Sequence, residues 1–150
     1  MAVYLADEQS EPADGADLVD LARHVLASQR VPEDMEVALL LVDRETITRL
    51  NATHMGQTGP TDVLAFPIDE PGESPPDAPS ILGDVVLCPV VATEQAPGFD
   101  RSAHEELRLL TVHGLLHLLG WDHATPEEER DMFALTDALL ASHEREVDHR

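Results

Sequence analysis

The stretch "VHGLLHLLGWDH", Val112–His123, places three histidines in one of the most apolar parts of an acidic chain. His113 and His117 are four residues apart, so on a helix their side chains share one face, with Cβ atoms roughly 6 Å apart. If Gly120 adopts a left-handed conformation, the chain turns back there and His123 approaches the same face from the following loop. The stretch therefore predicts a helix that ends near Gly120 and three imidazoles that meet beside its end.

Three imidazoles at this spacing predict a metal site. Two histidines on one helical turn and a third from a loop can reach a single ion at Zn–N distances of about 2.0–2.1 Å. Three protein nitrogens leave one tetrahedral position for water, which is the arrangement of catalytic rather than closed structural zinc sites. We therefore expect one zinc ion, or another divalent transition metal, on His113, His117 and His123; a purely structural ion is the alternative.

The same spacing, H-x3-H-x2-G-x2-H, occurs in the metzincin proteases, whose pattern has a glutamate directly after the first histidine. That glutamate is the general base of peptide hydrolysis. Gly114 stands at this position here. A metzincin-like protease is therefore only a remote alternative.

Composition bounds the remaining possibilities. A chain of 150 residues with 43% apolar residues is long enough for one domain with a buried core, and we expect a single domain over 1–150. The formal net charge is −21, and all nine basic residues are arginine. Such a charge repels other polyanions at long range, so composition alone weighs against generic binding of nucleic acids.

Localisation follows from what the sequence lacks. Cys88 is the only cysteine, so no disulfide can form within the chain. The first ten residues show no basic and apolar signal pattern, and runs such as "VALLLV" (37–42) are far shorter than the roughly 20 residues that span a membrane. We expect a cytoplasmic protein without a membrane segment.

Strands and helices alternate in the first two thirds of the chain. Apolar runs predict strands over 2–9, 35–43, 61–67 and 81–90. Apolar residues at helical spacing predict a helix over 14–29, and Asp43 is a suitable N-cap for a second helix. The segment 67–80 contains five prolines and is expected to be a mobile surface loop.

The last third is predicted to be helical. Ser102 and Glu105 match the capping-box pattern, and Thr125 with Pro126 supplies a second helix start. That last helix is expected to end near residue 142, before a charged, fraying tail over 143–150. Alternating elements followed by helices favour an α/β (α+β) fold, with the metal site on a helix of the C-terminal half and the following loop.

Four segments resemble the YbeY family, which is described as metal-dependent endoribonucleases and rRNA maturation factors. The most specific is "HGLLHLLGWDH" (113–123). The others are "ALLLVDRETITRLNATH" (38–54), "PTDVLAFP" (60–67) and "LGDVVLCPVVATEQA" (82–96). Together with the final helix, the resemblance covers about residues 36–140.

The resemblance implies a mixed four-stranded sheet flanked by helices and a zinc-like ion on the three histidines. It further implies hydrolytic processing of ribosomal RNA, especially at small-subunit precursor ends, and a role in ribosome quality control. Two positions depart from the family pattern. Met55 replaces an arginine thought to engage RNA phosphates, and Ala65 replaces a frequent serine. A methionine cannot make the bidentate phosphate contact of a guanidinium.

Metal-assisted phosphodiester hydrolysis is the leading hypothesis. Because Gly114 cannot act as a base, the proton must pass to another carboxylate or to the metal hydroxide itself. Asp84 is the candidate catalytic residue, because strand ends commonly project into the clefts of α/β folds. A role in orienting a ligand histidine is an equal alternative for Asp84. Asp62 and Asp122 are weaker candidates for the proton acceptor. A turn or cap role for Asp62 and a loop position for Asp122 explain these residues better.

A protein without catalytic activity is the main rival. An acidic surface attracts the basic proteins of the small ribosomal subunit, so the chain could be a metal-containing assembly factor that binds those proteins. Cleavage of ribosomal RNA by the protein distinguishes the two hypotheses.

Overall fold

A four-stranded mixed sheet forms the centre of the computed structural model, which describes residues 2–71 and 80–150. The strands are β1 (Ala2–Glu8), β2 (Met35–Val42), β3 (Val63–Pro67) and β4 (Ser80–Leu87), in the order β1-β2-β4-β3. β1, β2 and β4 run parallel, and β3 runs antiparallel to β4. The expected α+β class and the mixed four-stranded sheet are confirmed.

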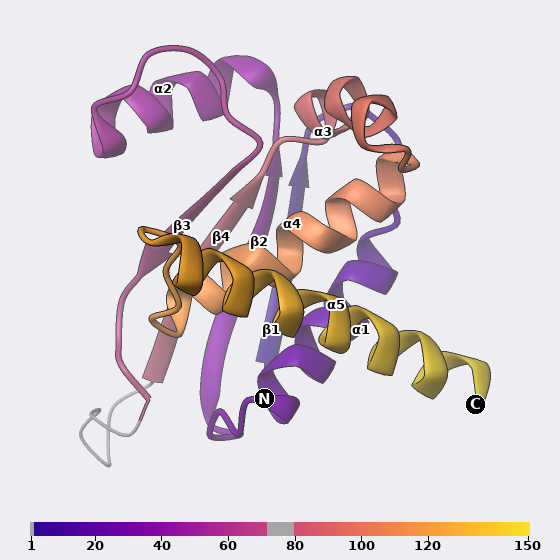
Figure 1. Ribbon diagram of the computed structural model, residues 1–150. Coiled ribbons are helices and arrows are strands. Elements are labelled where there is room, and N and C mark those ends of the chain that lie inside the picture. Colours follow the sequence, from indigo (N-terminus) through magenta and orange to yellow (C-terminus); the bar gives the residue numbers. More distant parts are fainter. Residues whose placement is uncertain (1, 72–79) are drawn as a thin grey trace.

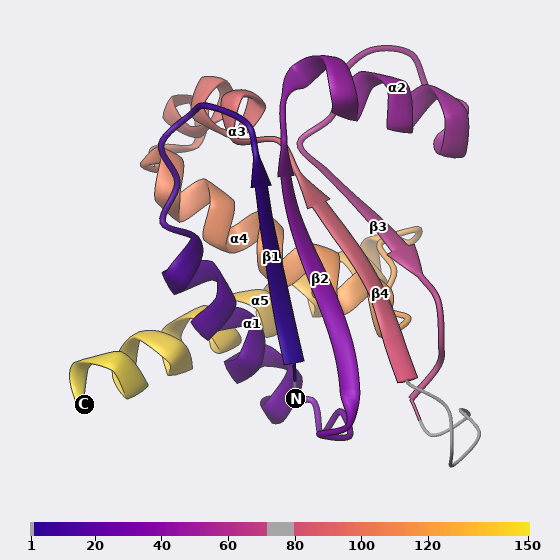
Figure 2. The same ribbon diagram turned by 180° about the vertical axis from the view of Figure 1, so that it is seen from behind.

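Helices cover the two faces of this sheet unequally. α1 (Gly15–Ser28), α4 (Ala103–Leu118) and α5 (Pro126–Asp148) lie on one face, as Figure 1 shows. The view from behind shows α2 (Arg44–Met55) at one end of the other face (Figure 2). α3 (Pro89–Gln95) and a short 3-10 turn (Ala96–Phe99) connect β4 to α4. One face is thus thickly covered, and the other is covered only at one end.

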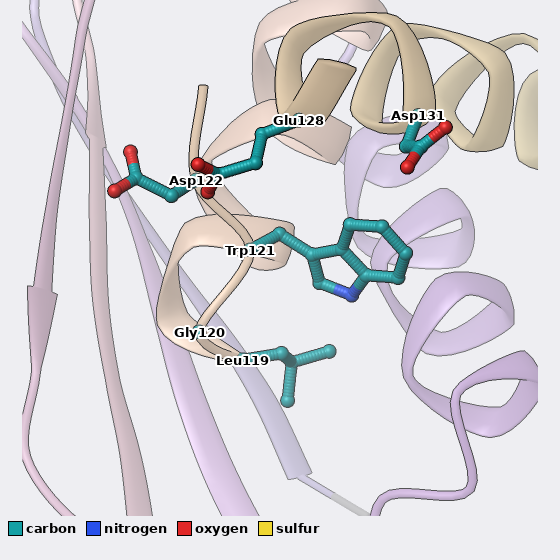
Figure 3. Close-up of a pocket in the computed structure, with 6 residues that line it drawn as sticks. All are labelled: Leu119, Gly120, Trp121, Asp122, Glu128 and Asp131. Atoms are coloured by element: carbon teal, nitrogen blue, oxygen red, sulfur yellow. The ribbon is translucent and has the colours of Figure 1, made fainter. Parts of the chain in front are cut away.

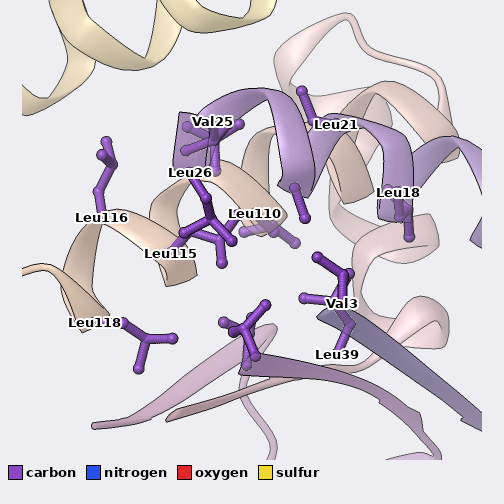
Figure 4. Packing of buried hydrophobic residues seen from close by; sticks show 14 of the residues in the cluster. Val3, Leu18, Leu21, Val25, Leu26, Leu39, Leu110, Leu115, Leu116 and Leu118 are labelled. Atoms are coloured by element: carbon purple, nitrogen blue, oxygen red, sulfur yellow. The ribbon is translucent and has the colours of Figure 1, made fainter. Parts of the chain in front are cut away.

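Alternation along the strands explains the two layers. In β2, Val37, Leu39 and Leu41 are almost fully buried and belong to the main core, while the intervening side chains point to the other face. Figure 4 shows leucines and valines of α1 and α4 packed above Val3 and Leu39 of the sheet. A smaller cluster lies under α2 and contains Val42, Ile47, Leu64, Val86 and Cys88.

The helix starts follow the predicted caps. The Asp43 and Thr125 side chains each accept a hydrogen bond from the backbone N–H three residues later, at 2.8 and 3.1 Å. Ser102 and Glu105 form the expected capping box, with bonds of 3.1 and 2.9 Å. The capping box sets the start of α4, and Asp43 and Thr125 set the starts of α2 and α5.

Two predicted boundaries were wrong. The strand expected over 81–90 ends at Leu87, because Pro89 lacks a backbone N–H and instead takes the first position of α3. The last helix continues to Asp148, so residues 143–150 are not a fraying tail. His143 is fully buried: its Nε2–H donates to Asp20 at 2.8 Å, and its Nδ1 accepts from Arg108 at 3.0 Å.

The loop expected over 67–80 can be followed only at its ends, because residues 72–79 lie outside the described part of the chain. The backbone N–H groups of Ile68 and Asp69 donate to Leu82 and Ile81 at 3.0 and 2.9 Å, which extends the β3–β4 pairing. Among the described helices, none is both long and apolar enough to cross a lipid bilayer.

Candidate metal centre

A cavity of about 220 Å³ brings the three histidines together. Its walls come from the C-terminal half of α4, the loop after it, the first turns of α5 and the start of β3. His113, His117 and His123 share the cavity with two carboxylates, Asp62 and Glu129. The remaining lining is apolar and comprises Val63, Leu110, Met132 and Phe133.

The C-terminal end of α4 places His123 beside the other two histidines. Gly120 has φ +94°, a left-handed conformation that glycine adopts without strain. The N–H groups of Gly120 and Trp121 return to the carbonyls of His117 and Leu116, at 3.1 and 3.0 Å. This is the Schellman pattern of helix ends, and it turns the chain back toward α4. The imidazoles of His117 and His123 consequently lie 5.1 Å apart, centre to centre.

His117 is oriented by the same turn. Its Nδ1 lies 3.1 Å from the carbonyl oxygen of Trp121 and donates a hydrogen bond to it. The proton on Nδ1 leaves the lone pair on Nε2, the other ring nitrogen, free to bind an ion. Metal-binding histidines in proteins commonly donate their second nitrogen to a backbone carbonyl in this way.

His113 is the most buried of the three. Its Nε2 has no hydrogen-bond partner among the described residues, and its ring meets Phe133 edge-on, with centroids 5.2 Å apart. Burial, and then the charge of His117, lowers the pKa of His113 to about 4. Burial also lowers the pKa of His117. Both imidazoles are therefore neutral at pH 7, the form that binds metal.

The chemistry of the donor atoms fits a metal ion, although the present side-chain positions do not form a coordination site. Among the described residues, no group of three or more histidine, cysteine, aspartate or glutamate side chains is arranged to hold an ion. What fits is the chemistry: a buried, unpartnered nitrogen on His113 and an oriented imidazole on His117. Neutral imidazoles are suitable ligands for zinc and neighbouring transition metals.

Gly114 is required by packing against the sheet. A Cβ at this position would lie 2.5 Å from Cγ1 of Val85, much closer than atoms can approach. Gly114 therefore allows α4 to lie directly on β4. The glutamate that metzincins carry here would collide with the sheet, which explains in physical terms why the protease base is missing.

The structure places Asp84 away from the histidines. Val85 faces α4 and Gly114, so its neighbour Asp84 points to the opposite face of the sheet. There it pairs in register with Ala38 of β2 and Phe66 of β3. Asp84 does not line the histidine cavity. The geometry thus gives no support to Asp84 as the proton acceptor.

Asp62 occupies the place expected of Asp84. It precedes β3, and its carbonyl accepts a hydrogen bond from the Cys88 N–H at 3.0 Å, which holds it beside the end of β4. The Gln95 side chain donates to one of its carboxylate oxygens at 2.8 Å. Its charge also acts on His113 and on the buried Glu106, although burial is the main cause that raises the pKa of Glu106. The sequence made Asp62 a weaker candidate than Asp84 and favoured a turn or cap role for it.

The remaining motif residues lie outside the histidine cavity. Trp121 lines a separate hollow of about 240 Å³ together with Asp122, Glu128 and Asp131 (Figure 3). Asp122 accepts a hydrogen bond from the N–H of His123 at 2.7 Å, which is a local loop contact. Met55 is exposed at the end of α2 and does not line the histidine cavity.

Comparison with known proteins gives one consistent match. The model of the family "Endoribonuclease YbeY" matches residues 4–144. A protein of that name from Salinispora tropica is 49% identical over 150 residues, covering 95% of this chain and 96% of the relative. One from Thermobifida fusca is 46% identical over 153 residues, with 99% and 97% covered. One from Mycobacterium tuberculosis is 47% identical over 145 residues, with 93% and 82% covered.

A solved structure also shares the fold. The solution structure of TM1509 from Thermotoga maritima is 27% identical and superimposes with a TM-score of 0.63. The superposition covers 98% of this chain and 92% of that protein.

Proposed function

Because this chain belongs to the YbeY family of endoribonucleases, we propose that it cleaves single-stranded ribosomal RNA at a centre formed by His113, His117 and His123. Family membership makes the chain a hydrolase of phosphodiester bonds. The proposed task is maturation of the 3′ end of the small-subunit precursor, together with ribosome quality control, in the cytoplasm. The observation that carries the proposal is the cavity in which the three histidines meet a carboxylate.

We propose that one zinc ion, or another divalent transition metal, binds these histidines. When bound, such an ion supplies Lewis-acid polarisation of a phosphoryl oxygen and lowers the pKa of its water toward about 7. The hydrogen bond to the Trp121 carbonyl keeps the proton of His117 on Nδ1, so that Nε2 is available to an ion. His113 contributes a nitrogen that finds no partner within the described protein.

Asp62 is the proposed proton acceptor. It lines the same cavity as the histidines, and the bond from Gln95 to one of its oxygens fixes its orientation. An ionised carboxylate only accepts protons and hydrogen bonds, so Asp62 can take the proton of an attacking water. The apolar wall of Val63, Leu110 and Met132 limits access of other water to this point.

The test is cleavage of an RNA that carries the 3′ end of the 16S precursor. Metal-loaded wild-type protein is compared with His113→Ala, purified identically so that a contaminating nuclease would appear in both samples. We expect cleavage near the mature 3′ end by the wild type and none by the variant. Equal cleavage by the two proteins, or none by either, would contradict the proposal.

A ribosome assembly factor without catalysis is the second candidate, and the net charge of −21 is the observation that favours it. Acidic surfaces associate with basic partners, including small-subunit proteins. Binding of small-subunit proteins by metal-loaded wild type that leaves the precursor RNA intact would favour this candidate. A metzincin-like protease is not supported, because Gly114 is packed against Val85.

A further inference from the structure

We propose that Phe133 and Glu129 form a nucleobase subsite beside the three histidines, and that guanine is the base it accepts. The inference rests on the proposed nuclease function and adds a substrate feature to it. Both residues come from the first turns of α5 and line the histidine cavity. They are four residues apart on this helix, so their side chains share a face.

Phe133 offers a surface for stacking. It lines the histidine cavity, yet 46% of its surface is exposed. Its contact with His113 is edge-to-face, with an interplanar angle of 63°, and this occupies only part of the ring. Aromatic side chains at such positions are the usual platforms for unpaired bases, because every base has a π-face. A base stacked on Phe133 would lie next to the proposed ion site.

Glu129 determines which base edge fits. Its carboxylate makes no hydrogen bond or ion pair with any other residue in the described part of the chain, whereas Asp62 in the same cavity is bonded to Gln95. An ionised carboxylate offers only acceptors. The edge of a base that meets Glu129 must therefore donate hydrogen bonds.

Guanine matches this requirement best. Its Watson–Crick edge carries two adjacent donors, N1–H and the 2-amino group, which can pair with the two oxygens of one carboxylate. Uracil has a single N–H between two carbonyl oxygens, and those oxygens would repel the carboxylate. Adenine and cytosine each offer an amino group beside an acceptor nitrogen.

The cavity is large enough for this occupant. Its volume is about 220 Å³. A water molecule occupies roughly 30 Å³, so an ion and its water leave most of the space for one flat ring. Double-stranded RNA does not present a free Watson–Crick edge, so the subsite also restricts the substrate to single strands.

The first test maps cleavage in a random single-stranded RNA pool. The metal-loaded proteins are wild type, Glu129→Gln, Phe133→Ala and Asp131→Asn; the last removes a carboxylate from the neighbouring hollow and is the matched control. In the sites cleaved by wild type and by Asp131→Asn, guanine should be enriched several-fold at one fixed position relative to the cleaved bond. In the sites cleaved by Glu129→Gln this enrichment should be lost. Phe133→Ala should raise KM roughly tenfold through lost stacking.

The second test needs no activity. Trp121 is the only tryptophan, so a Trp121→Phe/Phe133→Trp double variant carries its single indole at the proposed subsite. In metal-free protein, guanosine monophosphate should quench this fluorescence at several-fold lower concentration than uridine monophosphate. Metal content of Phe133→Ala is measured alongside, because a residue that merely supports His113 would lower it.

The outcomes separate the subsite from the nuclease function. Cleavage without base preference, or a preference unchanged in both Glu129→Gln and Phe133→Ala, would overturn the subsite and leave the nuclease intact. Absence of cleavage by the wild type would refute the nuclease function, and the nucleotide titration would then decide the subsite. Equal quenching by both nucleotides, or loss of metal as the sole effect of Phe133→Ala, would also overturn it.

Discussion

His117 donates a hydrogen bond from its Nδ1 to the backbone carbonyl of Trp121, 3.1 Å away, across the turn that ends α4. The N–H of the same Trp121 bonds to the carbonyl of Leu116. One residue therefore both closes the helix and orients the imidazole of His117. The orientation of the proposed metal ligand thus depends on the conformation of the turn, and Gly120 at φ +94° makes this turn possible.

The metal-free protein should lose stability as pH falls below neutrality. Burial holds the pKa of His113 at about 4, below the ordinary value of 6.5 that the unfolded chain retains. The unfolded state therefore binds this proton first, and the free energy of unfolding declines between pH 6.5 and about 4. Urea unfolding midpoints in EDTA across this range measure the decline. In His113→Gln the slope should be shallower; identical slopes would exclude His113 as the cause.

Asp62→Asn should impair catalysis, whereas Asp84→Asn should not. Loss of a general base typically lowers the rate by about 10²–10⁴-fold, so kcat of Asp62→Asn should fall by that order. Asp84 lies on the opposite face of the sheet, and its variant serves as the matched control. Single-turnover cleavage of the precursor RNA gives both rates. The assignment fails if the two variants cleave equally well or if only Asp84→Asn is impaired.

Gly114→Ala should destabilise the fold. The added methyl would lie 2.5 Å from Val85, and overpacking of this kind typically costs about 1–3 kcal/mol. Val85→Ala creates room, so in the double variant the cost of the added methyl should be smaller than in the wild-type background. Denaturant unfolding of the four proteins of this cycle measures the coupling. Strictly additive effects would show that the close approach of α4 to β4 does not limit this position.

His143→Leu tests the unexpected end of α5. The substitution leaves Asp20 and Arg108 without their buried partner, which typically costs about 1–3 kcal/mol. The exposed His149 is the control, and His149→Leu should change the free energy of unfolding by less than about 0.5 kcal/mol. If both variants unfold at the wild-type denaturant concentration, residues 143–150 behave as the tail that the sequence suggested.

Local signals predicted the helix starts and the convergence of the three histidines on one cavity. Caps at Asp43, Ser102 and Thr125 depend on a few neighbouring residues, so the sequence alone was sufficient. The same holds for the spacing of His113 and His117 on one helical turn. The end of α5 was misjudged because its charged residues conceal a buried position, His143, that is defined only by packing against α1 and α4.

Which of Asp62 and Asp84 lies beside the histidines could not be predicted in this way. The strand "ILGDVVL" is apolar on both sides of Asp84, so its pattern does not show which face α4 covers. Asp62 reaches the cavity because β3 pairs antiparallel with β4, in a register that joins Val63 to Leu87. Sheet pairing, rather than local pattern, thus places Asp62 and not Asp84 in the cavity.

The metal content of purified protein tests the central assignment most directly. Elemental analysis should find one divalent ion per wild-type chain and the same in His149→Ala, which removes an exposed histidine. His113→Ala and His117→Ala should each lose most of the ion, because neither remaining pair of imidazoles completes the site. An ion retained at full occupancy in a variant that lacks His113, His117 and His123 together would contradict the assignment.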